Sequence, residues 1–151
     1  MAAERQFTDQ EIQAMAVIRR WCDEGWSQGH YDVADEIIHP EFKVHGAGGQ
    51  VIQPGIEGLK GLIRMWRTGF PDGVQIVDDI FADGDTVGVR LTWEGTHLGE
   101  FMGVPPSGKR VKVGTLGIDR VVDGKVVEGW GELDMLGLMR TIGGLPSPSQ
   151  G

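Results

Sequence analysis

The chain reads RVKVGTLGIDRVVDGKVVEGWGELD at residues 110–134. Two runs rich in alternating apolar residues flank Asp123-Gly124, a dipeptide typical of the tight two-residue turn of a β-hairpin. The pattern therefore predicts two long antiparallel strands, Arg110–Val122 and Lys125–Asp134. If the turn contains two residues only, Val122 pairs with Lys125, and Asp134 is expected to lie opposite Val113.

This pairing also predicts which side chains share a face, because successive side chains of a strand point to opposite sides of the sheet. One face is expected to carry Glu128, Trp130, Glu132 and Asp134, with Thr115, Gly117 and Asp119 across from them. The other face is expected to be aliphatic, with Leu116, Ile118, Val127 and Leu133. The carboxylate-bearing face is consistent with a pocket wall or with a surface facing solvent.

Working outward, a second hairpin precedes the first. Val74–Ala82 and Thr86–Glu94 alternate apolar and polar residues on either side of Asp83-Gly84-Asp85. A loop over Gly95–Lys109 links the two hairpins.

The first half of the chain has helical periodicity. Thr8-Asp9-Gln10-Glu11 is a capping box that predicts the start of a helix reaching about Gly25. A short helix is expected over Tyr31–Ile38, then a strand over Phe42–His45, then a helix that Pro54-Gly55 opens and that stops before Phe70.

Helices followed by two long hairpins predict an α+β fold with helices packed against one face of a strongly bent antiparallel sheet. A bent sheet over helices encloses a pocket, where a small-molecule site is expected. We expect one domain over residues 1–143. The Gly-, Pro- and Ser-rich tail, residues 144–151, is expected to be disordered.

Composition excludes several classes of protein. The chain has 22 acidic and 14 basic residues, a formal charge of −8, and no basic cluster, which argues against a nucleic-acid partner. Cys22 is the single cysteine, so neither an intrachain disulfide nor a cysteine metal cluster is possible. The polar start and the lack of a long apolar run favour a cytoplasmic protein without a membrane partner.

Several motifs together resemble those of SnoaL-like polyketide cyclases over roughly Val17–Gly143. The segments that carry the resemblance are Gly95–Val111, Ile118-Asp119-Arg120, Asp123–Glu128, Trp130 followed four residues on by Asp134, His39–Phe42, Phe70-Pro71-Asp72 and Leu136-Gly137-Leu138. The resemblance implies the cone-shaped fold of the nuclear transport factor 2-like superfamily. It also implies intramolecular aldol ring closure on a polyketide-type ester, without a metal or organic cofactor.

In that family an Asp on the last strand is the general acid/base, and the motif places Asp134 in this role. The preceding strand often carries a histidine that faces this Asp, and Gly117 takes that position here. The resemblance further implies assembly through the sheets into a homodimer or homotetramer. The fold hosts other activities too, so epoxide opening, steroid-type isomerisation or dehydration, and non-catalytic small-molecule binding or assembly stay open.

Four residues are candidates for chemistry. Asp134, in an apolar cavity, would have a raised pKa suited to removing a proton next to a carbonyl; alternatively it caps a helical turn over Met135–Leu138. Glu132 is a second carboxylate that would share acid and base roles, or a solvated edge residue. His97 would donate a proton, or bond to backbone in its loop. Arg90 would hold a substrate carbonyl or pair with Asp134, or form a surface ion pair.

The remaining pocket candidates are residues that would surround a flat or polycyclic ligand: Trp26, His45, Trp93, Phe101, Met102, Gly117, Asp119, Trp130 and Met135. His39 and His45 without nearby cysteines are a weak metal signal, so no metal site is expected.

Overall fold

The computed structural model describes residues 5–46 and 48–146. The helical elements are α1 (Asp9–Arg20), the π-helix η1 (Trp21–Ser27), α2 (Val33–Ile37), α3 (Gly55–Gly69) and α4 (Met135–Ile142). The strands are β1 (Ile38–His45), β2 (Val51–Ile52), β3 (Val74–Asp83), β4 (Thr86–Thr96), β5 (Arg110–Val122) and β6 (Lys125–Leu133). In the described ranges no helix has the length and apolar character that a membrane crossing needs.

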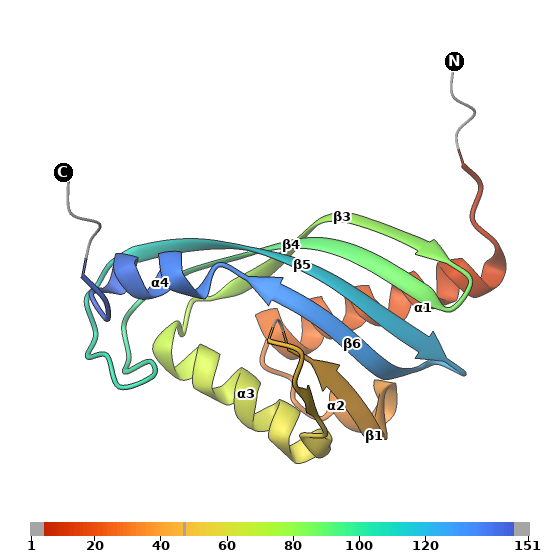
Figure 1. The fold of residues 1–151 in the computed structure, drawn as a ribbon, viewed down its shortest axis with the longest axis horizontal. Helices are drawn as coiled ribbons and strands as arrows, with labels where there is room; N and C mark the ends of the chain where they lie inside the picture. The colour runs from red at the N-terminus through yellow and green to blue at the C-terminus, as the bar shows by residue number, and fades with distance from the viewer. Residues whose placement is uncertain (1–4, 47, 147–151) are drawn as a thin grey trace.

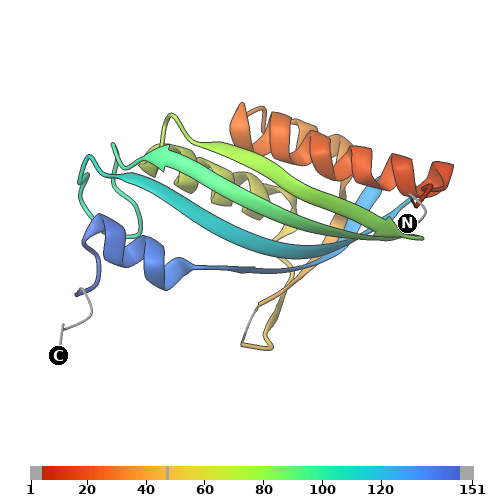
Figure 2. The same ribbon diagram turned by 90° about the horizontal axis from the view of Figure 1, so that it is seen from above.

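One sheet of six strands in the order β2-β1-β6-β5-β4-β3 forms the body of the molecule. Neighbouring strands are antiparallel except for β1 and β6, which run parallel. The helices α1, η1 and α3 cover one face of the sheet, and the long strands β3–β6 twist across them (Figures 1 and 2). The expected α+β class, with helices against a bent sheet, is confirmed. We call the helix-covered face the inner face and the opposite one the outer face.

The first helix begins at the predicted capping box. The N–H of Glu11 donates to the Thr8 hydroxyl at 3.2 Å, and the N–H of Thr8 donates to the Glu11 carboxylate at 2.9 Å. That carboxylate also accepts the N–H of Gly84 at 3.0 Å, which ties the helix to the β3–β4 turn. Beyond Arg20 the helix widens into η1, a change of helix type that the apolar spacing did not predict.

The last hairpin has the predicted turn but a different register. Val122 pairs with Lys125 and Val121 with Val126, as predicted, but Arg120 then pairs with Glu128. Val127 is therefore an extra residue on β6, and such a bulge shifts every later pair by one. Because a shift of one residue exchanges the two faces of a strand, the predicted grouping of side chains is wrong from this point on.

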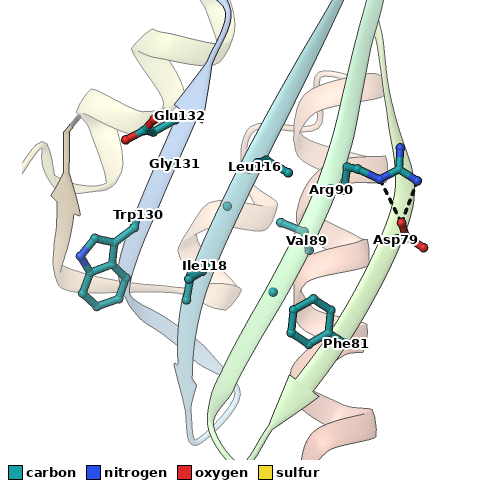
Figure 3. Close-up of a pocket in the computed structure, with 11 residues that line it drawn as sticks. Asp79, Phe81, Val89, Arg90, Leu116, Ile118, Trp130, Gly131 and Glu132 are labelled. Atoms are coloured by element: carbon teal, nitrogen blue, oxygen red, sulfur yellow. Dashed lines mark hydrogen bonds and ion pairs between the residues drawn. The ribbon is translucent and has the colours of Figure 1, made fainter.

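The corrected register separates two groups that the sequence analysis put together. Thr115, Gly117 and Asp119 lie on the inner face, where β6 contributes Gly129 and Gly131 opposite them. Leu116, Ile118, Trp130 and Glu132 lie on the outer face (Figure 3). The strand ends at Leu133, which pairs with Thr115, so Asp134 is not opposite Val113 as predicted.

Two apolar clusters hold the inner face to the helices. The first joins α1, η1 and α2 to the sheet through residues such as Ile18, Ala34 and Val87. The second gathers Trp66, Phe70, Trp93 and Phe101 with Leu138 of α4. The C-terminal tail predicted to be disordered lies outside the described residues from position 147 on; within the described part, Gly144 donates its N–H to the carbonyl of Met139 at 2.8 Å.

Candidate active site

A cavity of about 180 Å³ lies between the inner face of the sheet and the helices. Its walls are Ile18, Trp21, Cys22 and Trp26 from the first helices, Phe42, Val44 and Leu59 from β1 and α3, and Gln75, Val89, Leu91, Thr115, Gly117, Asp119, Gly129, Trp130 and Gly131 from the sheet. Most of these side chains are apolar or aromatic, with few polar groups among them. Such a lining is typical of a small-molecule site.

Asp119 is the residue of this lining whose carboxyl has a pKa near neutral pH. It lies on β5 opposite Gly129 and two residues from Gly117. Desolvation by burial raises the pKa of its carboxyl from 3.8 to about 7. Across residues 5–46 and 48–146 we find no hydrogen bond or ion pair to this carboxyl, so nothing offsets the cost of burying its charge.

The wall facing the sheet is built by η1. A π-helix has a wider turn than an α-helix and is frequent at functional sites. Here it presents Trp21 and Trp26, whose rings meet edge-on with centroids 6.5 Å apart. Gly25 makes room for this wall, because a Cβ there would come within 2.8 Å of the Trp21 ring.

Arg67 of α3 fixes the end of η1. Its guanidinium donates to the carbonyls of Trp26 at 2.9 Å and Ser27 at 2.8 Å, and also to those of Gly73 at 2.9 Å and Pro71 at 3.0 Å. One side chain thus joins the end of the π-helix to the turn before β3. These hydrogen bonds hold the backbone at Trp26 in place, and with it the indole ring that lines the cavity.

Two further groups give the cavity its polar character. Thr115 supplies a hydroxyl and Gln75 an amide, both of which can donate to a carbonyl oxygen. The Gln75 backbone is fixed by Ser27, whose hydroxyl accepts the Gln75 N–H at 2.9 Å. Cys22 is no nucleophile here, because burial, together with the nearby Asp119 and Asp23 charges, raises the pKa of its thiol to about 12.

Figure 3 shows Arg90, Glu132 and the ring of Trp130 on the outer face. His45 lies on the same face, because its ring stacks on that of Trp130. Arg90 points away from the cavity and binds Asp79 through two nitrogens, at 2.9 and 2.7 Å. Glu132 is exposed on the same face. His45 stacks on Trp130 with ring centroids 4.4 Å apart and bonds Glu128 at 2.8 Å. The expected place of Arg90, Glu132 and His45 in the cavity is wrong, whereas Trp130 lines the cavity although its ring lies on the outer face. The bulge turns the last residues of β6 outward, and Arg90 alternates with the buried Val89 and Leu91.

Asp134 is likewise outside the cavity. It is the N-cap of α4, exposed, with its carboxylate accepting the N–H of Gly137 at 2.8 Å. Of the two interpretations of the sequence, the structure supports the cap, and the expected apolar surroundings are wrong. β6 ends one residue before it, so strand alternation no longer decides where its side chain points.

His97 is fully buried in the second apolar cluster region rather than in the cavity. Its Nδ1 accepts the N–H of Ser107 at 3.1 Å, and its ring lies 5.5 Å from that of Phe70. Its loop is held closed by hydrogen bonds between His97 and both Lys109 and Gly108. The structure thus gives His97 a role in anchoring the loop.

The other predicted pocket residues divide into two groups. Trp26, Gly117 and Asp119 line the cavity. Trp93 and Phe101 are buried in the second cluster, with Met135 packed against it, and Met102 is exposed in a turn with a φ of 49°. Sequence reasoning missed Trp21, Phe42 and Gln75 as lining residues. Of the two tryptophans on this wall, Trp26 had been predicted as a pocket residue and Trp21 had not.

The chain is similar in sequence to known cyclases. A family model described as SnoaL-like polyketide cyclase matches residues 16–142. The nogalonic acid methyl ester cyclase of Streptomyces nogalater is 27% identical over 119 residues, which cover 78% of this chain and 89% of that protein.

Two solved structures are similar over nearly the whole chain. A SnoaL-like polyketide cyclase from Jannaschia sp. CCS1 has a TM-score of 0.84 and 31% identity, covering 95% of this chain and 100% of the other. AclR of Streptomyces galilaeus, described as a hydroxylase, has a TM-score of 0.81 and 28% identity, covering 93% and 87% of the two chains.

Proposed function

Since this chain belongs to the SnoaL-like polyketide cyclase family, we propose that it closes a ring in a carbonyl-bearing small molecule held in the inner cavity, with Asp119 as the proton-transfer group. The relative from Streptomyces nogalater is named as a cyclase of nogalonic acid methyl ester, and the matching family is described as polyketide cyclases; together these support a polyketide-type ester as the substrate class. The observation that carries the proposal is a carboxyl without a bonding partner in the described chain, set in a largely apolar cavity with its pKa raised to about 7.

The reaction needs no redox step. The Asp119 carboxylate takes a proton from a carbon next to a carbonyl, and the resulting enolate attacks a second carbonyl of the same molecule. One C–C bond forms, the attacked carbonyl becomes an alkoxide, and the protonated Asp119 returns the proton to it. Substrate and product are isomers, so the carboxyl ends as it began.

A pKa near 7 suits both halves of this cycle. At neutral pH the carboxylate and the carboxylic acid are both populated, and efficient general acid–base catalysis has its pKa close to the working pH. An ordinary aspartate would be a weak base and nearly always ionised. Desolvation is therefore the physical cause of the proposed reactivity.

The enolate oxygen also needs stabilising donors. The Thr115 hydroxyl and the Gln75 amide are the neutral donors that the lining offers on the sheet side. Preorganised donors aimed at an atom stabilise the negative charge that develops on it during the reaction. We assign them this role in place of His97 and Arg90, which lie elsewhere.

Asp119→Asn tests the proposal, with nogalonic acid methyl ester as the first substrate to assay. Asn keeps the shape of the side chain and removes its proton-transfer capacity, so turnover is expected to fall by roughly 100-fold or more. The matched control is Asp134→Asn, which changes an exposed carboxyl to the same amide and is expected to keep turnover. Full activity of Asp119→Asn would reject Asp119 as the base.

We also propose that the chain forms a homodimer through its outer face. A hollow of about 530 Å³ there is bordered by the exposed apolar side chains of Phe81, Leu116, Ile118 and Trp130. Glu132 lies on the β6 side of Leu116, and Arg90 with Asp79 on the β3 side (Figure 3).

Charge complementarity favours a second copy as the occupant of this face. Two such faces related by a two-fold axis parallel to the strands bring the β6 side of one copy over the β3 side of the other. Glu132 then meets Arg90 of the second copy, and Trp130 meets Phe81. Oligomeric state in solution, measured for the wild type and for a charge introduced at Leu116, decides this point.

A further inference from the structure

The sheet beside Asp119 is unusually bare of side chains. Gly129 lies opposite Asp119 on β6, Gly117 is two residues away on β5, and Gly131 is paired with Gly117. All three line the cavity. Glycine in a strand interior is unfavourable by roughly 0.5–1 kcal/mol relative to alanine, so three neighbouring glycines need a reason.

Backbone conformation does not supply that reason. The glycines with positive φ in the described chain lie in turns and helix ends, as at Gly84, Gly124 and Gly143, and not at these three positions. A strand glycine without special backbone angles marks a place where something approaches the backbone closely.

For Gly129 the approaching group is the protein itself. A Cβ at this position would lie 2.7 Å from the Asp119 Oδ1 and 3.2 Å from the Phe42 ring. Gly117 is intermediate, since its Cβ would meet Val89 Cγ2 at 3.2 Å. Both can be understood from packing within the chain.

Gly131 is different. Among the described residues, a Cβ there would find a single neighbour within 4 Å, the carbonyl oxygen of Leu116 at 3.8 Å, and no side chain. The fold has room for a methyl group at this position. What the glycine preserves is empty space in the cavity, next to the paired Gly117 and beside Asp119.

We propose that Gly131, with Gly117, is the specificity-determining floor of the cavity, against which one flat face of an unsaturated ring of the ligand lies. Two paired glycines on adjacent strands give a strip of bare backbone that a planar ring can contact and that a bulky, rounded ligand cannot exploit. On the helix side, the rings of Trp21 and Trp26 cover the inner face. The gap between these rings and the glycine floor therefore limits how thick a bound ligand can be.

This inference rests on the proposed function for the identity of the cavity as the ligand site, but it concerns binding and not turnover. It therefore predicts selectivity in a protein that has lost its catalytic group. Gly131→Ala is the informative change, because the extra methyl occupies ligand space and would meet no side chain of residues 5–46 or 48–146 within 4 Å.

The experiment measures calorimetric binding of two ketones with equal numbers of carbon atoms, methyl β-naphthyl ketone, which is flat, and adamantyl methyl ketone, which is globular. It uses the full chain, both as wild type and as Asp119→Asn. The wild type is expected to bind the flat ketone at least about tenfold more tightly than the globular one, and Gly131→Ala to weaken the flat ketone about tenfold, the effect of one methyl group in a filled pocket. Asp119→Asn is expected to keep the preference.

The control variant is Gly114→Ala. Gly114 is on the same hairpin, has no atom of the described part of the chain within 4 Å of its Cβ position, and lies outside the cavity lining. It is expected to bind both ketones as the wild type does, and thermal unfolding is expected to show both alanine variants folded. Three results would each contradict the proposed role of Gly131: equal binding of the two ketones by the wild type, binding of neither ketone, or an unchanged affinity of Gly131→Ala for the flat ketone. Loss of catalysis in Asp119→Asn alone would leave it standing.

Discussion

Asp119 and Gly129 are paired across the β5–β6 ladder, and the Oδ1 atom of Asp119 lies only 2.7 Å from the point where a Cβ on residue 129 would be. The carboxyl thus lies over bare backbone, and the residues that the structure describes offer it no counter-charge. Desolvation without compensation raises its pKa to about 7, and that single property links the fold to the chemistry proposed for it.

The activity of the protein should rise with pH through about 7. Proton abstraction requires the carboxylate form of Asp119, whose pKa is raised to about 7, so kcat/KM increases as the group ionises. The measurement is a profile of kcat/KM between about pH 5 and 9. A rate already constant above pH 5 would show that a carboxyl of ordinary acidity, and not Asp119, limits the reaction.

The same group should make the fold less stable as pH rises. The folded-state pKa of about 7 lies above the unfolded value of 3.8, so the folded state holds a proton that the unfolded state loses between these values. Stability is full below the unfolded pKa, declines through this window and stays low above about 7, by up to a few kcal/mol. Asp119→Asn should therefore be stabilising in urea unfolding at pH 8 and nearly neutral at pH 4. A loss of stability at pH 8 would contradict this.

Asp134 should matter for stability and little for turnover. Its carboxylate caps α4 by accepting the N–H of Gly137. Asp134→Ala is expected to lower the free energy of unfolding by about 0.5–2 kcal/mol, while Asp134→Ser, which can also cap, should recover most of it. Assays of both variants below their melting temperatures check the point. A folded Asp134→Ser variant without activity would restore Asp134 as a catalytic candidate.

A charge at the centre of the outer face should dissociate the proposed dimer. Leu116 is 64% exposed there, and Leu116→Glu would bury a carboxylate against an apolar partner face. Light scattering coupled to size-exclusion chromatography is expected to give a dimer for the wild type and a monomer for this variant. Leu62→Glu, at an exposed position on α3, is the control that should remain dimeric. A monomeric wild type would reject the assembly.

Arg67 should control the mobility of the Trp26 wall. Lysine cannot donate to four carbonyls from one planar group, so Arg67→Lys is expected to cost about 1–3 kcal/mol and to raise KM more than it lowers kcat. Faster amide exchange at residues 26–28 would locate the effect. Arg64→Lys on the same helix, where the arginine is exposed over the Tyr31 ring, is the control without such exchange.

Much of this protein was determined by local sequence. Thr8 and Glu11 begin the first helix, Asp123-Gly124 makes the hairpin turn, and the alternation of Val87, Val89 and Leu91 marks a strand with one buried face. Each of these signals acts through bonds or contacts between near neighbours in the chain, so it survives being interpreted without the rest of the molecule. The family motifs added the arrangement of helices and sheet.

The tertiary structure alone decided which face each site residue occupies. One extra residue on β6, Val127, moves Trp130 and Glu132 to the outer face and leaves Asp119 over Gly129 on the inner one. A bulge carries no clear local signature, because its position depends on how β5, β6 and the parallel strand β1 fit together. The sequence therefore predicted a carboxylate in a cavity, but the packing of distant strands places Asp119 there and not Asp134. The register of β6 depends on what covers each face of the sheet, and that is known only from the tertiary structure.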